Sequence, residues 1–455
     1  MNTFFFRPSG WFPILGMGVW ISLLCPCAGQ DEVVVISPNW DGIKEETARA
    51  FNAWHEKNYG RPAIIRWREA GGGASQIIRF LRSEYQVESS AGIDVLDGGG
   101  SDPFRELEKD GLLMRYDPPV ELLAQIPADL NGMELIDPDH AWFCTALSGF
   151  GILTNERARR AIGLPEARTW SDLTDPRLCG WISAVDPRAS SSAMQIYEII
   201  LQAYGWEKGW GTLMQMSGNV RQFLSSAAAS VVEVGTGDDA YGVTIDMYGN
   251  AQAAYYGAEN VRFVLPEGET IVSPDAVAIL KNPPHPEMAR HYVEFTLSRD
   301  RQLLWMMPRG SPGGAKQYTI NRMSVWPALY GECAGMTPIA SNPFTMRNDF
   351  VYNSTLAAKR RGVLGVLIAA WMIDTHDVLV GTWKALNSPA AQKLAPEQRE
   401  KLLARFLAPP CTEAELSTLA DTDWTDPIRR TTLINRWQNE ALDREKSLLA
   451  QIDGE

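Results

Sequence analysis

The sequence predicts an α/β protein with more than one structural unit, and three observations support this fold class. Short apolar runs alternate with amphipathic stretches in two separate regions of the chain. The 455 residues are enough for two or three domains. The composition, 45% hydrophobic and 21% charged, is typical of a globular protein with sizeable cores.

In the first region, three short apolar strands are each followed by a loop and a helix. The expected strands are 33–36, 63–67 and 93–96, and the expected helices begin near residues 42, 75 and 102. Glycine-rich loops, 71–75 and 98–101, follow the second and third strands. Repeated strand–loop–helix units predict a mainly parallel sheet covered by helices.

The second region repeats this alternation from about residue 149. The expected elements are strands 181–185 and 241–245, helix 193–204, a return strand 273–280 and helix 286–298. From about residue 330 helix patterns dominate, with expected helices at 363–373, 396–406 and 431–452. The apolar stretch 363–373 is too short to span a bilayer, which favours a buried core helix.

Several motifs in this order resemble one family of proteins. They are Ile36-Ser37-Pro38-Asn39-Trp40, Gly72-Gly73-Ala74-Ser75, the segment 169–176, Asp186-Pro187 followed by serines, Ile245-Asp246-Met247-Tyr248, and the segment 273–278. Over residues 31–314 the chain resembles the ABC-transporter solute-binding proteins of the ferric-ion and phosphorylated-solute group. The resemblance implies the type II periplasmic-binding (transferrin-like) fold, with two sheets joined by a hinge, and here a C-terminal helical extension.

The resemblance also implies a division of the chain. We expect a signal peptide at 1–29, a discontinuous first lobe at 30–145 and 273–329, a second lobe at 146–272, and a helical extension at 330–455. The two crossing strands are expected near 146–153 and 270–276. A ligand would bind between the lobes and favour their closure, so both lobes must contact it. A monomer that delivers its ligand to an ABC permease in the inner membrane is implied.

Candidate binding residues follow the strands, because ligands of such sheets bind at the carboxyl ends of the strands. Ser190, Ser191 and Ser192 stand where a strand turns into a helix, a position that suits an anion. An ordinary serine helix cap is the alternative. In the first lobe, Gly73-Ala74-Ser75 and Gly99-Gly100-Ser101 allow close backbone approach to a ligand, or simply form tight turns.

Other candidate residues bear on the kind of ligand. Asn39 and Trp40 follow the first strand, where ferric binders of the resembling family often have a histidine. Those binders also use an adjacent tyrosine pair, and here Met247-Tyr248 supplies one phenol. Tyr255-Tyr256 is an adjacent pair further along, where a helix face that packs inward is the better interpretation. Asp246 and Tyr248 suit the hydroxyls of an organic solute, although Asp246 could instead cap a helix.

Ser225 and Ser226 precede the small-residue stretch 227–230. They form either another helix start at the ligand site or a surface turn. Together these residues favour a small anionic organic solute, such as a sugar phosphate or phosphonate, with ferric ion as the alternative.

Composition excludes some functions and leaves others open. A net charge of −13 argues against nucleic acid, which requires a basic surface. Neither a catalytic motif nor metal-ligand spacing among the five histidines is found, so no cofactor and no enzymatic activity are expected. An enzyme or a sensor on the same scaffold remains the further alternative.

The N-terminal residues and the cysteines bear on whether the protein is exported from the cytoplasm. Arg7, an apolar stretch over 11–24 and the small residues Ala28 and Gly29 are typical of a secretory signal peptide, with a retained anchor as the alternative. Export predicts a periplasmic protein. Four cysteines follow this segment and allow three disulfide pairings, of which we favour Cys144–Cys179 with Cys333–Cys411; four buried free thiols are the alternative, and the sequence does not decide between disulfides and thiols.

Overall fold

The computed structural model describes residues 31–71, 73–339, 341–422, 424 and 426–454, so the expected signal peptide lies outside the described residues. The first lobe begins with three parallel strands in the order β2-β1-β3. These are β1 (Asp31–Ile36), β2 (Ala63–Arg68) and β3 (Val95–Asp97), followed respectively by α1 (Asp41–Tyr59), α2 (Ala74–Val87) and α3 (Asp102–Lys109). The predicted α/β fold with strand–loop–helix units is confirmed for this region.

The second lobe has the same design. Strands β10, β8 and β9 are parallel neighbours, and helices follow each of them. The elements are α5 (Glu156–Ile162), β8 (Ile182–Val185), α6 (Ser191–Tyr204), α7 (Trp206–Asn219), β9 (Val220–Leu224), α8 (Ala227–Thr236), β10 (Tyr241–Ile245), α9 (Asp246–Tyr256) and β11 (Val261–Val264). Two short 3₁₀ turns, Trp170–Thr174 and Pro176–Leu178, precede β8.

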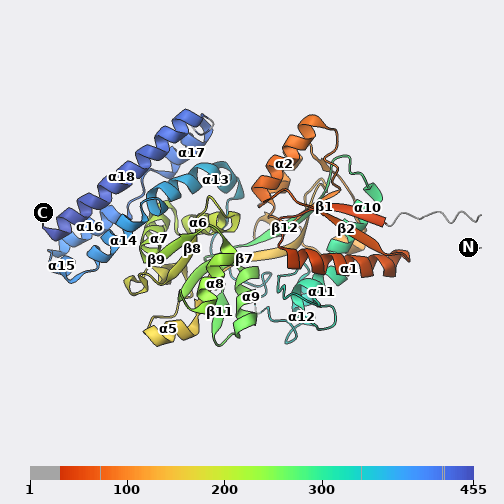
Figure 1. Ribbon diagram of the computed structural model, residues 1–455, viewed down its shortest axis with the longest axis horizontal. Helices are drawn as coiled ribbons and strands as arrows, with labels where there is room; N and C mark the ends of the chain where they lie inside the picture. Colours follow the sequence, from red (N-terminus) through yellow and green to blue (C-terminus); the bar gives the residue numbers. More distant parts are fainter. Residues whose placement is uncertain (1–30, 72, 340, 423, 425, 455) are drawn as a thin grey trace, which may run out of the picture.

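Two long strands join the lobes. β7 (Phe143–Asn155) pairs with β12 (Val272–Leu280) over its first half and with β10 and β11 over its second half. Every residue of β7 is buried. Figure 1 shows β7 and β12 running between the two lobes, which lie side by side. The chain therefore crosses from one lobe to the other twice, once along β7 and once along β12.

The chain returns to the first lobe after β12. The elements after this return are α10 (Pro286–Leu297), α11 (Arg299–Met306) and α12 (Pro327–Glu332). The first lobe also contains four short elements that precede β7: β4 (Leu113–Met114), α4 (Val120–Leu123), β5 (Asp129–Leu130) and β6 (Met133–Glu134). The apolar core of this lobe includes Trp326, Leu329 and Ile339. Residues just beyond 330 thus pack with the first lobe, past the expected end of that lobe at 329.

The C-terminal helices form a layer on the second lobe, drawn in blue in Figure 1. They are α13 (Ser354–Ile368) with a π-helical turn (Ala369–Ile373), α14 (His376–Leu386), α15 (Pro389–Gln392), α16 (Pro396–Leu407), α17 (Glu413–Thr422) and α18 (Pro427–Asp453). Trp371, Trp383, Phe406 and Trp437 are buried in the same apolar cluster as the second lobe. The helical layer and the second lobe therefore share one core.

Among the described residues, no single helix is long and apolar enough to cross a bilayer. The helices 354–373 and 376–386, bent by 61° at the break between them, together reach the required length and hydropathy.

The favoured disulfides are wrong. Cys144, Cys179, Cys333 and Cys411 are all free thiols in the structure. Cys144 and Cys333 belong to the core of the first lobe, whereas Cys179 and Cys411 pack against the core of the second lobe. Each favoured pair joined segments that were close in the proposed division of the chain but that the fold places in different cores.

Candidate functional site

A cleft of about 540 Å³ lies between the lobes and collects most of the expected binding residues. The expected residues that line it are Asn39, Trp40, Gly73, Ala74, Gly99, Gly100, Ser101, Ser190, Ser191, Ser192, Ser225, Ser226 and Tyr248. They come from loops that follow β1, β2 and β3 in one lobe and β8, β9 and β10 in the other. The carboxyl ends of the strands in both lobes thus converge on one cavity.

The cleft is formed to a large extent by the starts of helices. The residues that precede helices α1, α2 and α3 in the first lobe, and α6, α8 and α9 in the second, all line it: Trp40, Gly73, Ser101, Ser190, Ser226 and Ile245. A helix start carries unsatisfied N–H groups and the positive end of the helix dipole. Each such start stabilises a nearby anion by about 0.3–1 kcal/mol. Six of them make this cleft suited to a negatively charged group.

In the first lobe, the loop after β3 brings its backbone close to neighbouring chain. Gly98, Gly99 and Gly100 have φ angles of 92°, 106° and 86°, which L side chains rarely adopt. A Cβ on Gly99 would lie 2.9 Å from the Cβ of Ala74. The Gly100 N–H donates to Asp275 Oδ1 at 2.8 Å, which ties the loop to the hinge strand β12. The glycines are therefore required by the close fit of this loop.

Asn39 and Trp40, in the loop after β1, have different surroundings. Asn39 lies against Gly98, and its backbone N–H donates to Ser37 Oγ at 3.1 Å. The Trp40 ring covers Gly42 and meets Tyr318 edge-on, with 5.4 Å between ring centroids. Trp40 is also 37% exposed, so one part of the ring is available at the cleft.

Of the serines at the start of α6, one caps the helix and all three line the cleft. Ser190 Oγ accepts from the Ala193 N–H at 3.3 Å, which is an ordinary helix cap. Ser190 Oγ also lies 3.0 Å from Ser192 Oγ. Ser191 and Ser192 form the first turn of α6 and line the cleft. Ser190 thus fixes the helix start, and its two neighbours are the better candidates for ligand contact.

Ser226 differs from Ser190 in one respect. It precedes α8 and lines the cleft together with Ser225, yet its side chain makes no capping hydrogen bond. The hydroxyl and the first N–H groups of α8 are therefore available to another acceptor or donor. Ser75 belongs to the first turn of α2.

Of Asp246 and Tyr248, only Tyr248 lines the cleft. Tyr248 is half-buried and lines the cleft. Asp246, the first residue of α9, is fully buried and is not among the lining residues. Burial raises the pKa of its carboxyl to about 7, although Arg322 and backbone hydrogen bonds at Met247 and Gly149 act in the opposite direction. Asp246 lies behind the cleft wall rather than on its surface.

Sequence reasoning missed Arg322, a buried arginine that lines the cleft. Its Nη2 donates to Ser148 Oγ at 2.9 Å and to Asp275 Oδ2, and its guanidinium lies 5.0 Å from the Trp305 ring centroid. Asp275, Ser148 and Ser273 line the cleft beside it, on the crossing strands β7 and β12. A lone arginine in an irregular segment carries no motif, so only the fold could place it here.

Three further lining residues come from the C-terminal part of the chain: Tyr352, Ser354 and Arg361. Tyr352 is buried, and Gln195 Nε2 of α6 donates to its hydroxyl at 2.6 Å. No feature of the sequence associated this region with the cleft.

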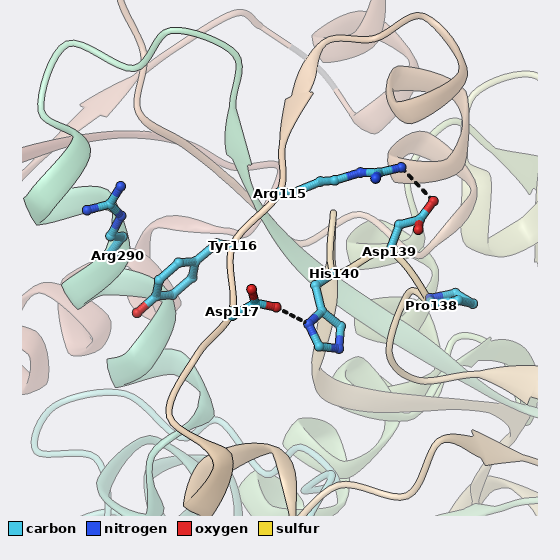
Figure 2. A pocket seen from close by; sticks show the side chains of 7 residues that line it. All are labelled: Arg115, Tyr116, Asp117, Pro138, Asp139, His140 and Arg290. Atoms are coloured by element: carbon cyan, nitrogen blue, oxygen red, sulfur yellow. Dashed lines mark hydrogen bonds and ion pairs between the residues drawn. The ribbon is translucent and has the colours of Figure 1, made fainter.

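A second hollow lies on the first lobe and is shown in Figure 2. It is lined by Arg115, Tyr116, Asp117, Pro138, Asp139, His140 and Arg290. Arg115 pairs with Asp139 and His140 with Asp117, both at 2.6 Å, as the dashed lines in Figure 2 mark. Because Arg115 and His140 each contact a carboxylate of the hollow itself, this hollow is a weaker candidate than the cleft between the lobes.

Two α/β lobes, two crossing strands and a cleft at their strand ends define a solute-binding protein with the type II periplasmic-binding fold. Residues 93–324 match the family model described as bacterial extracellular solute-binding protein. The chain belongs to this family. The prediction of a solute-binding protein is therefore confirmed.

Relatives of known sequence or structure extend the comparison. A phosphoglycerate transport regulatory protein of Salmonella typhimurium, PgtC, is 34% identical over 153 residues. That match spans 34% of this chain and only 38% of the relative. A Haemophilus influenzae protein of unassigned role is 28% identical over 57% of this chain and 71% of the relative.

Solved structures share the fold at low identity. The periplasmic binding protein AfuA of Actinobacillus pleuropneumoniae, with bound fructose-6-phosphate, is 20% identical, with a TM-score of 0.55 over 78% of this chain and 98% of that one. Apo ferric ion-binding protein A of Pasteurella haemolytica is 19% identical, with a TM-score of 0.56 over 74% and 96%. Both leave a part of this chain unmatched.

Proposed function

We propose that this protein captures a small anionic organic solute, a phosphate ester or phosphonate, and delivers it to an ABC permease in the inner membrane. The observation that carries the proposal is the convergence of six helix starts from both lobes on one cleft. A phosphoryl group there can accept hydrogen bonds from backbone N–H groups and serine hydroxyls. Contacts from both lobes would make ligand binding favour closure.

The rest of the cleft suits the organic part of such a solute. Trp40, Phe150 and Tyr248 provide aromatic surface, and Gln195 provides a polar group for hydroxyls. The fold is shared with a protein whose solved structure contains fructose-6-phosphate. A relative named for phosphoglycerate transport, although matched over only part of its length, supports the same class of solute. Binding and release need no catalytic residue.

Ferric ion is the second candidate, favoured by the fold shared with a ferric ion-binding protein and by Tyr248 in the cleft. The cleft is less suited to it. Neither Tyr255 nor Tyr256 lines the cleft. Tyr256 packs against the small apolar cluster that contains Leu153 and Val234, as expected, whereas Tyr255 is 80% exposed, contrary to the expected inward packing. Asn39 stands at the end of the first strand, where a histidine is typical of the iron binders.

Calorimetry and thermal unfolding with fructose 6-phosphate, 3-phosphoglycerate, a phosphonate and ferric ion with carbonate would test the proposal. A ligand at one hundred times its Kd should stabilise the protein by about 2.7 kcal/mol. Ser226→Ala should weaken binding of the organic anion without affecting stability, since Ser226 makes no capping bond. Ser388→Ala, which removes the cap of α15 outside the cleft, is the matched control.

Two outcomes would contradict the proposal. One is binding of ferric ion with a visible tyrosinate-to-iron absorption band, together with no binding of organic anions. The other is an equal effect of Ser226→Ala and Ser388→Ala on the binding of every organic anion that stabilises the parent.

A further inference from the structure

The C-terminal helical layer is attached rigidly to the helix whose start lies in the cleft. Arg360 of α13 forms a buried ion pair with Glu198 of α6, with 2.7 Å between Nη2 and Oε1. A Cβ on Gly365 would lie 3.1 Å from the sulfur of Met194, so α13 and α6 pack closely. Asn353 and Gln202 add a hydrogen bond of 2.7 Å near the start of α13. The layer must therefore move with the second lobe.

The next residue on α13, Arg361, lines the cleft. Its Nη2 donates to the carbonyl oxygen of Ser191, in the first turn of α6, at 3.3 Å. This places a guanidinium directly beside the helix start that is best suited to an anion. Figure 1 shows α13 as the C-terminal helix that reaches toward the first lobe.

Arg361 is also the one residue of this layer with an ion pair to the first lobe, within the part of the chain that the structure describes. Its Nη1 lies 3.8 Å from Asp102 Oδ2, at the start of α3. That separation exceeds a hydrogen bond, and both side chains are 33% exposed. A guanidinium has five N–H donors, so most of those of Arg361 remain available to a ligand.

We propose that the C-terminal layer forms a third wall of the solute site. In this site Arg361 binds the anionic group of the solute. Before the solute binds, Asp102 is the partner of Arg361. The inference rests on the proposed function, since it requires an anionic organic solute at these helix starts. On binding, the solute's phosphate or carboxylate oxygens replace Asp102 as the partner of Arg361. A charge-assisted contact of this kind is stronger than a neutral hydrogen bond.

The two partners then have opposite effects on affinity, which gives a test. With 3-phosphoglycerate as the probe in calorimetry, Arg361→Gln should weaken binding by about tenfold or more, because a charged contact is lost. Asp102→Asn should instead tighten binding several-fold, because a competing and repelling carboxylate is removed. If the pair of Arg361 and Asp102 served only to hold the lobes together, both substitutions should change the affinity in the same direction.

Matched controls separate local contact from changes in total charge. Lys359→Gln removes the same charge from the same helix, but Lys359 pairs with Asp421 of α17 at 2.7 Å and does not line the cleft. Asp110→Asn removes an acid at the end of α3, where Asp110 pairs with Arg82. Both controls should leave the affinity for 3-phosphoglycerate within about twofold of the parent, which is a change in binding free energy no larger than about RT.

The outcomes distinguish this inference from the proposed function. Parent protein that binds 3-phosphoglycerate, with unchanged affinity in Arg361→Gln, overturns the role of Arg361 and leaves the anion site in place. Equal weakening by Arg361→Gln and Asp102→Asn also overturns it. If the parent protein binds none of the organic anions, the proposed function is contradicted, and so is the role of Arg361 that depends on it.

Discussion

Arg360 and Glu198 form an ion pair whose two side chains are 0% and 3% exposed, and this pair joins the C-terminal layer to the second lobe. The arginine also contacts Glu413 of α17 and lies 5.3 Å from the Trp206 ring centroid. One guanidinium thus connects α6, α13 and α17. Because the apolar cluster of the second lobe continues into the layer, we expect the two parts to unfold together.

Arg360→Ala should destabilise the protein strongly, because it leaves the Glu198 carboxylate buried without its partner. Removing one member of a buried pair costs about 3–5 kcal/mol. Chemical denaturation should show a single transition at lower denaturant concentration. Lys359→Ala, on the exposed side of the same helix, should change stability by less than about 0.5 kcal/mol. A separate early transition in the parent would instead show that the layer unfolds by itself.

The glycine loop after β3 gives a second prediction. Gly99→Ala should lower stability and weaken solute binding, because the new Cβ would lie 2.9 Å from the Cβ of Ala74 and 3.2 Å from Pro38 Cγ, at a φ of 106°. Left-handed strain alone costs about 1–2 kcal/mol, and the close contacts add to it. Thermal unfolding and calorimetry measure both effects.

Gly60→Ala is the control for the strain. Gly60 has a φ of 71° at the end of α1, and nothing lies within 4 Å of its Cβ position. We expect a moderate loss of stability and unchanged solute affinity in this variant. Equal losses of affinity in Gly60→Ala and Gly99→Ala would contradict the assignment of the loop to the ligand site.

The loops that line the cleft could be predicted from the sequence better than the helices that pack around them. Loops after parallel strands must meet at one edge, so the positions of Gly99, Ser191 and Ser226 followed from local patterns. Helix α7, which contains Gly209, Gly211 and Gly218, was not among the expected helices. In the structure, Cβ atoms on Gly209 and Gly218 would lie 2.8 Å from Leu201 Cα and 2.5 Å from the Trp383 ring. These glycines allow neighbouring helices to pack closely, a property of the tertiary fold.

Residues from outside the matched motifs could not be placed in advance for the same reason. Arg322 follows Asn321, whose φ is 52°, in a segment without regular structure. Arg361 occupies a helix that has no counterpart among the motifs of the family. Both reach the cleft only because distant elements pack against it.

The four thiols give a third prediction. Treatment of the folded protein with a reductant should leave the melting temperature unchanged, because the structure contains no disulfide among the described residues. Alkylation followed by mass spectrometry should label Cys144 only after unfolding, since it is fully buried and burial raises its pKa. Cys179 and Cys411, which are partly exposed, should react faster. A large loss of stability on reduction would contradict the free-thiol state.

Asp246 gives a prediction about pH. Burial raises the pKa of its carboxyl to about 7 in the folded protein, from an ordinary value of 3.8. The folded state therefore binds the proton more tightly than the unfolded state. The resulting stabilisation is complete below about pH 4, falls as the pH rises, and is lost above about pH 7.

Asp246→Asn should remove this dependence, because an amide needs no proton to remain neutral. Relative to the parent, the variant should gain stability as the pH rises from 4 to 8, by a change on the order of 4 kcal/mol for a shift of about three pKa units. Chemical denaturation of both proteins across this range measures the difference. Asp110→Asn, at an exposed ion pair, is the control for the removal of one carboxylate. A difference between parent and Asp246→Asn that stays constant from pH 4 to 8 would show that Asp246 ionises at an ordinary pKa despite its burial.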